Sequence, residues 1–92
     1  MPVITVVHAE GCHFCDDARA VLAGLGREYP LRVELVDAAS PAGAELVRAH
    51  RAPMFPLVLV DGEFFSYGRL PVRKLRRLLE ALTAQRAAVR TR

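Results

Sequence analysis

The stretch VITVVHAEGCHFC, residues 3–15, decides the fold, because a β-branched run in it leads into two closely spaced cysteines. The run from Pro2 to Val7 has the composition of a strand. From the cysteines onward, apolar residues recur at the spacing of one helix face, at Phe14, Ala18, Val21, Leu22 and Leu25. Gly24 and Gly26 predict the end of that helix. The cysteine pair therefore lies between a strand and the start of a helix.

The spacing of Cys12 and Cys15 suits disulfide exchange. The thiolate is the nucleophile in this chemistry, and the unpaired N–H groups of a helix N-terminus favour a thiolate at Cys12. Cys15 lies one helical turn further on, where it can attack a mixed disulfide held on Cys12 and release the reduced product. A protonated His13 beside the sulfurs would stabilise the thiolate. Gly11 allows the chain to turn tightly into the helix.

A metal site is the alternative use of the same two cysteines. A structural zinc ion needs four ligands, and the nearest further candidates are His8 and His13. These histidines bracket the cysteines more closely than zinc-finger spacing does, so we predict no metal ligands here. The neighbouring Asp16 and Asp17 complement the positive end of the helix dipole.

The segment after the first helix predicts a second strand and a short second helix. Apolar residues alternate with others from Leu31 to Val36, as in a strand. Ser40 then offers its hydroxyl to the free N–H groups of a helix start, and Pro41 suits the first helical position. We expect this helix to end at about His50.

The second half of the chain predicts a hairpin followed by a closing helix. Leu57–Val60 forms a third strand, the Asp61-Gly62 pair a two-residue turn, and Glu63–Ser66 a short fourth strand. Pro71 opens the last helix. One apolar stripe runs along that helix, at Leu75, Leu78, Leu79 and Leu82.

The expected element order, β-α-β-α-β-β-α, predicts an α/β fold. The first two strands are joined by a helix and should be parallel with a right-handed crossover, and the hairpin supplies antiparallel pairing. The result is a four-stranded mixed sheet with helices on both faces. The chain has 92 residues, which is room for a single domain over 1–92.

Composition excludes two classes of protein and predicts a compartment. Hydrophobic residues make up 52% of the chain, which argues against disorder, and the apolar runs, such as Leu57–Val60, are too short to span a membrane. The first residues lack the basic and apolar regions of a signal peptide, so we predict a cytoplasmic protein. Because thiols are kept reduced there, a Cys-x-x-Cys is catalytic or metal-binding more often than structural.

Positive charge is concentrated near the C-terminus. The formal net charge is +3, yet the stretch from Arg69 to Arg92 holds eight basic residues against Glu80 alone. Such a stretch can meet nucleic acid or acidic proteins. We favour a solvated helix face followed by a frayed basic tail over 84–92, because charge alone carries no binding geometry. We therefore predict neither a nucleic-acid nor a membrane partner.

With Phe55-Pro56 directly before the third strand, the chain resembles the thioredoxin superfamily, and its glutaredoxin branch in particular. The resemblance covers nearly the whole chain, through Gly-Cys-x-x-Cys at one helix start and Pro-Leu-Val-Leu-Val-Asp-Gly-Glu over 56–63. It implies that Pro56 is a cis-proline facing the cysteines, and that the backbone of Phe55 binds an extended substrate. Pro53 competes for this role but lies too far from the hairpin. Phe14 supplies the aromatic residue that the family carries between its cysteines.

Several positions depart from the glutaredoxin pattern. Ala9 stands where those proteins carry a lysine, and Val6 where thioredoxins carry a buried aspartate. The glycine pair and acidic residue that hold glutathione are replaced by Ser-Tyr-Gly-Arg over 66–69. The reversed charge at Arg69 predicts weak use of glutathione, while Arg69 can still attract a substrate carboxylate.

Together these features predict a disulfide reductase of the glutaredoxin and thioredoxin kind. Cys12 attacks a disulfide in a protein or small molecule, and Cys15 resolves the intermediate. No tightly bound cofactor is expected beyond the redox-active Cys12–Cys15 disulfide, which an external thiol or reductase would reset. We predict a monomer. The alternative is a metal or iron–sulfur carrier that uses the same Cys-x-x-Cys.

Overall fold

The computed structural model describes residues 1–90, with the surroundings of side chains as far as Gln85. Its elements follow the predicted order. The first half holds β1 (Val3–His8), α1 (His13–Glu28), β2 (Arg32–Asp37) and α2 (Pro41–His50). The second half holds β3 (Leu57–Val60), β4 (Glu63–Tyr67) and α3 (Val72–Arg90). Within this described part, no helix is both long and apolar enough to cross a lipid bilayer.

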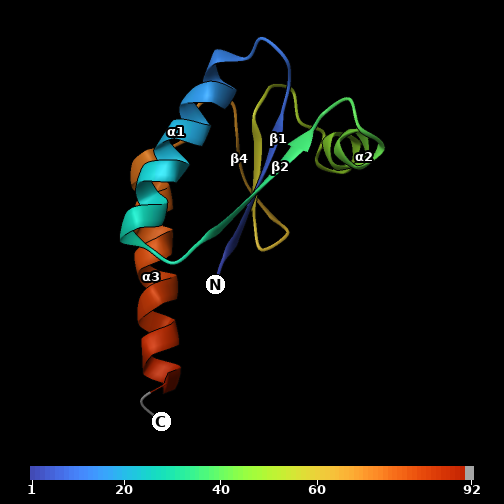
Figure 1. Cartoon of the computed structure of the whole chain (residues 1–92). Coiled ribbons are helices and arrows are strands. Elements are labelled where there is room, and N and C mark those ends of the chain that lie inside the picture. The colour runs from blue at the N-terminus through green and yellow to red at the C-terminus, as the bar shows by residue number, and fades with distance from the viewer. Residues whose placement is uncertain (91–92) are drawn as a thin grey trace.

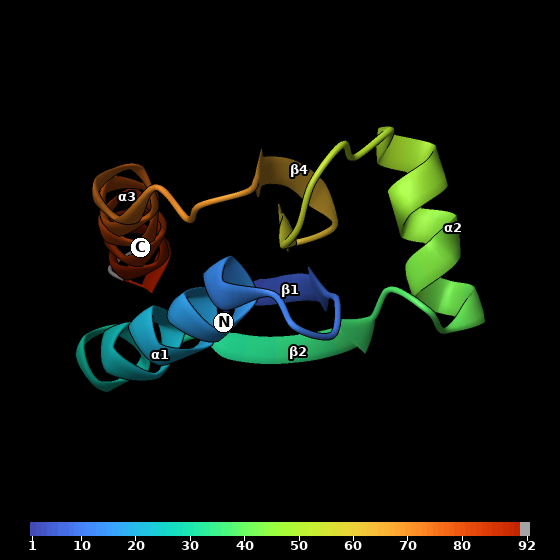
Figure 2. The ribbon, with the colours of Figure 1, turned by 90° about the horizontal axis from the view of Figure 1, so that it is seen from above.

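The four strands form one mixed sheet, as predicted, and their order across it is β2-β1-β3-β4. β1 is parallel to β2, whereas β3 is antiparallel to both β1 and β4. Figure 1 shows the strands beside the three helices, and Figure 2 shows α1 and α3 on one face of the sheet with α2 on the other. The predicted three-layer α/β arrangement is therefore confirmed.

Each face of the sheet buries its own cluster, because successive strand residues point to opposite sides. Ile4 and Val6 of β1 belong to the larger cluster, which joins the sheet to α1 and α3. Val7 faces the other way and packs with Leu57 and the α2 side. A fully buried aliphatic side chain contributes about 1.5–3 kcal/mol relative to exposure. The predicted stripe of α3 lies in the larger cluster, with Leu75 and Leu79 buried and Leu78 and Leu82 packed against it.

The two helix-start signals and the hairpin signal are confirmed. Ser40 accepts a hydrogen bond from the Gly43 N–H through its Oγ at 3.0 Å, and Pro41 is the first residue of α2. The carbonyl of Pro71 accepts from the Leu75 N–H at 3.0 Å and so begins α3. The Asp61-Gly62 turn has positive φ at both residues.

The predicted end of the first helix is wrong. Gly24 and Gly26 lie inside α1, which continues to Glu28. The last turn is held by tertiary contacts that the local sequence does not reveal. Leu25 is buried in the larger cluster, and Glu28 forms an ion pair with Arg76 of α3 at 2.7 Å. These contacts outweigh the modest cost of glycine in a helix, about 1 kcal/mol per residue.

The predicted basic tail over 84–92 lies only partly within the described residues. Its first part is helical, because α3 runs to Arg90. Residues 91–92 lie outside the described part of the chain. Figure 1 shows α3 extending well beyond the sheet on the side away from the start of α1.

Candidate active site

Four strand ends meet at one edge of the sheet. His8 at the end of β1 pairs with Asp37 at the end of β2. Val7 pairs with Leu57 at the start of β3, and Leu57 in turn pairs with Tyr67 at the end of β4. The segments that follow β1, precede β3 and follow β4 therefore leave the sheet at the same edge. These three segments carry the site residues predicted from the sequence, and Figure 1 shows α1 beginning at this edge.

The two cysteines lie at the start of α1 and form a disulfide, with 5.2 Å between their Cα atoms. Cys12 is the N-cap residue, with an extended backbone, and its Sγ accepts a hydrogen bond from the Cys15 N–H at 3.1 Å. The Cys12 carbonyl accepts from the Asp16 N–H at 3.2 Å, as expected where a helix begins. The Cys12 sulfur thus faces one of the N–H groups that a helix start leaves unpaired.

The environments of the two cysteines differ. Cys15 is 2% exposed and lies among the core residues, whereas Cys12 is partly exposed. Of the two residues, Cys12 is therefore the more accessible to solvent. The roles of the two cysteines stay a prediction.

The residues around the cysteines shape the turn into α1. Gly11 has a φ of +71°, a conformation that costs side-chain-bearing residues free energy, so the predicted tight turn is present. His13 is exposed as the first residue of α1. Phe14 follows it and is 41% exposed, which leaves an aromatic surface beside the cysteines. The effect of His13 on the thiolate stays a prediction.

The loop before β3 supplies the second part of the site. The Phe55–Pro56 peptide bond is cis, as the resemblance predicts, and Pro56 is fully buried. The Pro56 carbonyl accepts from the Gly68 N–H at 3.0 Å, which ties this loop to the segment after β4. Among the backbone hydrogen bonds of the loops in residues 1–90, none uses the N–H or carbonyl of Phe55. The role of the Phe55 backbone in substrate binding stays a prediction.

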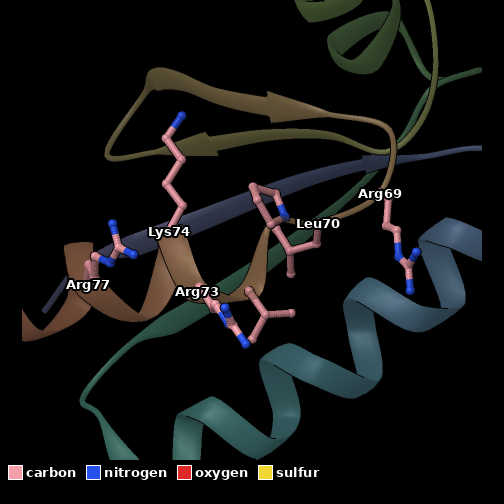
Figure 3. Close-up of a pocket in the computed structure, with 7 residues that line it drawn as sticks. Arg69, Leu70, Arg73, Lys74 and Arg77 are labelled. Atoms are coloured by element: carbon pink, nitrogen blue, oxygen red, sulfur yellow. The ribbon is translucent and has the colours of Figure 1, made fainter.

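The segment after β4 contributes Arg69, which is exposed and lines a surface hollow at the start of α3 (Figure 3). Tyr67, in the Ser-Tyr-Gly-Arg stretch singled out in the sequence, is 45% exposed at this edge. Sequence reasoning missed one apolar neighbour here. Met54 is 45% exposed, and its side chain packs against the backbone of Gly68. Met54 belongs to no recognisable motif, and only the meeting of the loops at this edge brings it beside the predicted residues.

The metal alternative rests on histidines near the cysteines. In the described part of the chain, no three residues among His, Cys, Asp and Glu gather closely enough to hold a metal ion. His8 lies at the end of β1, beside Asp37, where both line a hollow of about 550 Å³ with Glu10.

Comparisons with known proteins address the fold. No protein-family model matches the chain. No curated protein matches it either. Among solved structures, an uncharacterized thioredoxin-like protein from Clostridium perfringens aligns with a TM-score of 0.72 at 15% identity, covering 89% of this chain and 71% of that one. A malarial protein aligns with a TM-score of 0.66 at 14% identity, covering 88% and 96%.

A third solved structure, that of a designed protein, aligns with a TM-score of 0.67 at 21% identity and covers 92% of this chain and 75% of its own. At such identities the likeness concerns the fold alone. The cysteine pair at the start of α1, within disulfide distance, is an observation on this chain itself. The chain therefore has a thioredoxin-like fold with a Cys-x-x-Cys pair at its first helix, and this combination supports a redox role.

Proposed function

We propose that this chain is a thiol–disulfide oxidoreductase that reduces disulfides through Cys12 and Cys15. The observation that carries the proposal is the asymmetry of one disulfide. Cys12 is a partly exposed residue at a helix N-terminus, and Cys15 is a buried residue one turn along the same helix.

Cys12 performs the first step in the reduced protein. Its thiolate attacks one sulfur of the substrate disulfide and forms a mixed disulfide with it. The other substrate sulfur leaves as a thiolate, which takes up a proton and becomes the first substrate thiol. The Cys15 N–H, at 3.1 Å from the Cys12 sulfur, would stabilise the attacking thiolate, as would the positive end of the α1 dipole. His13, exposed on the same turn, is placed to add a positive charge when it is protonated.

Cys15 performs the second step. Its thiolate attacks the Cys12 sulfur of the mixed disulfide, forms the Cys12–Cys15 disulfide, and releases the second substrate thiol. Two electrons pass from the protein to the substrate, and an external thiol or a reductase returns the pair to its reduced state. Reduction is the proposed direction because the predicted compartment, the cytosol, keeps thiols reduced.

Substrate binding is assigned to the loop before β3. The free N–H and carbonyl of Phe55 would pair with an extended segment of a disulfide-bearing protein, as a strand is added to a sheet edge. Phe14 offers apolar contact next to the attacked bond. A protein disulfide is therefore the favoured substrate.

Glutathione is proposed to bind weakly. Ala9 supplies no cation, and Arg69 places positive charge where an anion would be needed for the glutathione amine. Losing such contacts removes about 1.5–3 kcal/mol for each hydrogen bond to a charged group. Calorimetry of the Cys15→Ser protein with glutathione should give no tight binding, and a dissociation constant in the low micromolar range would contradict this assignment.

The experiment that tests the proposed function is a trapping assay. Fully reduced protein is mixed with a model protein disulfide, quenched with acid, and analysed by mass spectrometry. The Cys15→Ser variant should accumulate the mixed disulfide on Cys12, whereas Cys12→Ser should form none. Absence of any exchange by the native protein, together with bound metal or an iron–sulfur absorption band, would favour the carrier alternative.

A further inference from the structure

The start of α3 forms a basic hollow, defined here by the seven residues drawn in Figure 3. Its volume is about 640 Å³. The lining residues are Arg69, Leu70, Pro71, Val72, Arg73, Lys74 and Arg77. Four of these carry a positive charge, and none carries a negative charge. Apolar residues form the floor between the charged side chains, so the hollow suits an anionic chain that also has apolar atoms.

In the described part of the chain, the four cations of the basic hollow form no ion pairs. The ion pairs there use Arg32, Arg48 and Arg76 instead. Lys74 packs its Nζ over the ring of Phe65, 5.0 Å from the ring centre, and still reaches solvent. The other three cations are exposed. They are therefore available to a partner.

The charge pattern of α3 opposes what its own dipole favours. A helix N-terminus carries partial positive charge, so acidic residues stabilise the first turn and basic residues do not. The first turn of α1 holds Asp16, whereas the first turn of α3 holds no acidic residue and includes Arg73 and Lys74. The first turn of α3 thus lacks the negative charge that its helix dipole favours, and no acidic residue of that turn supplies it. This arrangement points to an anion from outside the chain.

The basic hollow starts at the edge that holds the disulfide. Arg69 follows Gly68, whose N–H is bonded to the Pro56 carbonyl in the loop before β3. Figure 3 shows the side chains of Arg69 and Arg73 extending toward α1, the helix that begins at the cysteines. A substrate lying on the Phe55 backbone would therefore have its neighbouring residues close to Arg69.

We propose that the basic hollow selects substrates in which an extended, acidic segment lies next to the disulfide, an inference that rests on the proposed function. Arg73 and Arg77 are one helical turn apart, about 6 Å along the axis. In an extended chain, every second residue recurs after about 6.6–6.8 Å on the same side. Acidic residues at alternate positions of the substrate therefore recur at about the interval that separates positions 73 and 77 along the helix axis. Attraction of this kind acts mainly on the rate of association.

Nucleic acid is the other polyanion to consider, and the lining residues disfavour it. Proteins that bind single strands stack bases on aromatic side chains. The basic hollow has no aromatic residue among its lining residues. An acidic polypeptide needs only the cations and the apolar floor, both of which are present.

The test is a single-turnover rate with two peptides. Each peptide carries one cysteine capped as a mixed disulfide with 2-mercaptoethanol, followed by an extended segment with either Glu or Gln at every second position. The reduced protein consumes one mixed disulfide, forms its Cys12–Cys15 disulfide, and releases the peptide thiol and 2-mercaptoethanol, so no other reductant is needed. We expect the Glu peptide to react about tenfold faster at low salt, with the preference shrinking at high salt.

The matched variants are Arg73→Glu with Arg77→Glu, and Arg32→Glu with Arg48→Glu as the control. Both pairs change the net charge equally, and the control arginines are exposed, at 69% and 79%, on β2 and α2. We expect the first pair to abolish the preference for the Glu peptide and the control pair to keep it. Equal rates for both peptides, or a preference that survives Arg73→Glu with Arg77→Glu, would overturn the proposed substrate class but leave the proposed function standing.

Two other outcomes also count against the proposal. If the native protein reduces neither peptide, the proposed function fails, and the substrate class fails with it. If a single-stranded oligonucleotide competes with the Glu peptide more strongly than a free acidic peptide of equal charge does, the hollow is a nucleic-acid site instead.

Discussion

Two helices of this molecule begin with a hydrogen bond at the same position, from the N–H three residues on to the side chain of the capping residue, but the acceptor atom differs. At the start of α2, the Ser40 Oγ accepts from the Gly43 N–H at 3.0 Å. At the start of α1, the Cys12 Sγ accepts from the Cys15 N–H at 3.1 Å. An oxygen is the stronger acceptor, so the first bond serves the stability of a helix. Sulfur is the weaker acceptor and the better nucleophile, so the same geometry at α1 serves chemistry.

The donor positions differ as well. Gly43 lies against the backbone carbonyl of Asp37, so no side chain fits there. Cys15, at the equivalent position of α1, has a buried side chain that faces the cap atom. The chain therefore uses one helix-start geometry twice, once to fasten α2 to β2 and once to hold two sulfurs.

Replacing the α1 cap should have the largest effect. Cys12→Ser keeps a side chain that accepts the Cys15 N–H, and serine is among the best N-cap residues. We expect the variant to retain the stability of the reduced native protein while losing all disulfide exchange. Thermal unfolding under reducing conditions, with an exchange assay alongside, separates these effects. A variant that lost its fold would show that Cys12 is needed for structure.

Adding a side chain at Gly43, whose N–H donates to the Ser40 cap of α2, should have the next largest effect. In Gly43→Ala, the new methyl group would overlap the Asp37 backbone, and we expect a loss of unfolding free energy of about 1–3 kcal/mol, as for other overpacked sites. The control is Gly24→Ala, because the Cβ position at Gly24 has open space around it and alanine favours a helix. Chemical denaturation of both proteins measures the difference, and equal destabilisation would contradict the close approach.

Removing the α2 cap should have a smaller effect. Ser40→Ala leaves the Gly43 N–H without its acceptor and should lower the unfolding free energy by about 1 kcal/mol. The rate of disulfide exchange should stay unchanged, because α2 contributes no sulfur. Denaturation and the exchange assay on one preparation check both statements, and a fall in the exchange rate without loss of stability would link α2 to the site.

The ion pair at the far end of α1 should have the smallest effect. The hydrogen bond from Arg76 lowers the pKa of the Glu28 carboxyl below its ordinary value. A carboxyl with a lowered pKa in the folded state adds stability above its ordinary pKa and loses it as the pH falls through the folded value. The pair is exposed, so the gain is slight. Melting curves of native protein and Glu28→Gln should differ slightly at neutral pH and coincide in strong acid, and a difference that grew in acid would contradict the assignment.

The sequence predicts most of the fold because its signals are local. The Ser40-Pro41 start, the Asp61-Gly62 turn and the periodic leucines of α3 each act within a few residues. The predicted end of α1 was wrong, because its last turn is held by contacts with Arg76 and with core residues that lie far along the chain.

The site residues that belong to a motif could be predicted from the sequence, and the others could not. The cysteine pair follows from a recognisable motif, and the cis bond before Pro56 follows from the resemblance to the thioredoxin superfamily. The exposed Met54 and the apolar floor under the α3 cations do not, since only the meeting of loops at one sheet edge creates them. Surfaces assembled from several loops leave no periodic trace in a sequence.

The difference in reactivity between the two cysteines is the central claim, and competitive alkylation measures it most directly. The reduced protein is treated with a limiting amount of iodoacetamide at mildly acidic pH, digested, and the label at each cysteine is counted by mass spectrometry. The N–H groups at the start of α1 favour the thiolate of Cys12, whereas Cys15 is only 2% exposed. We therefore expect about tenfold more label on Cys12 than on Cys15. Equal labelling, or preferential labelling of Cys15, would contradict the assignment of Cys12 as the nucleophile.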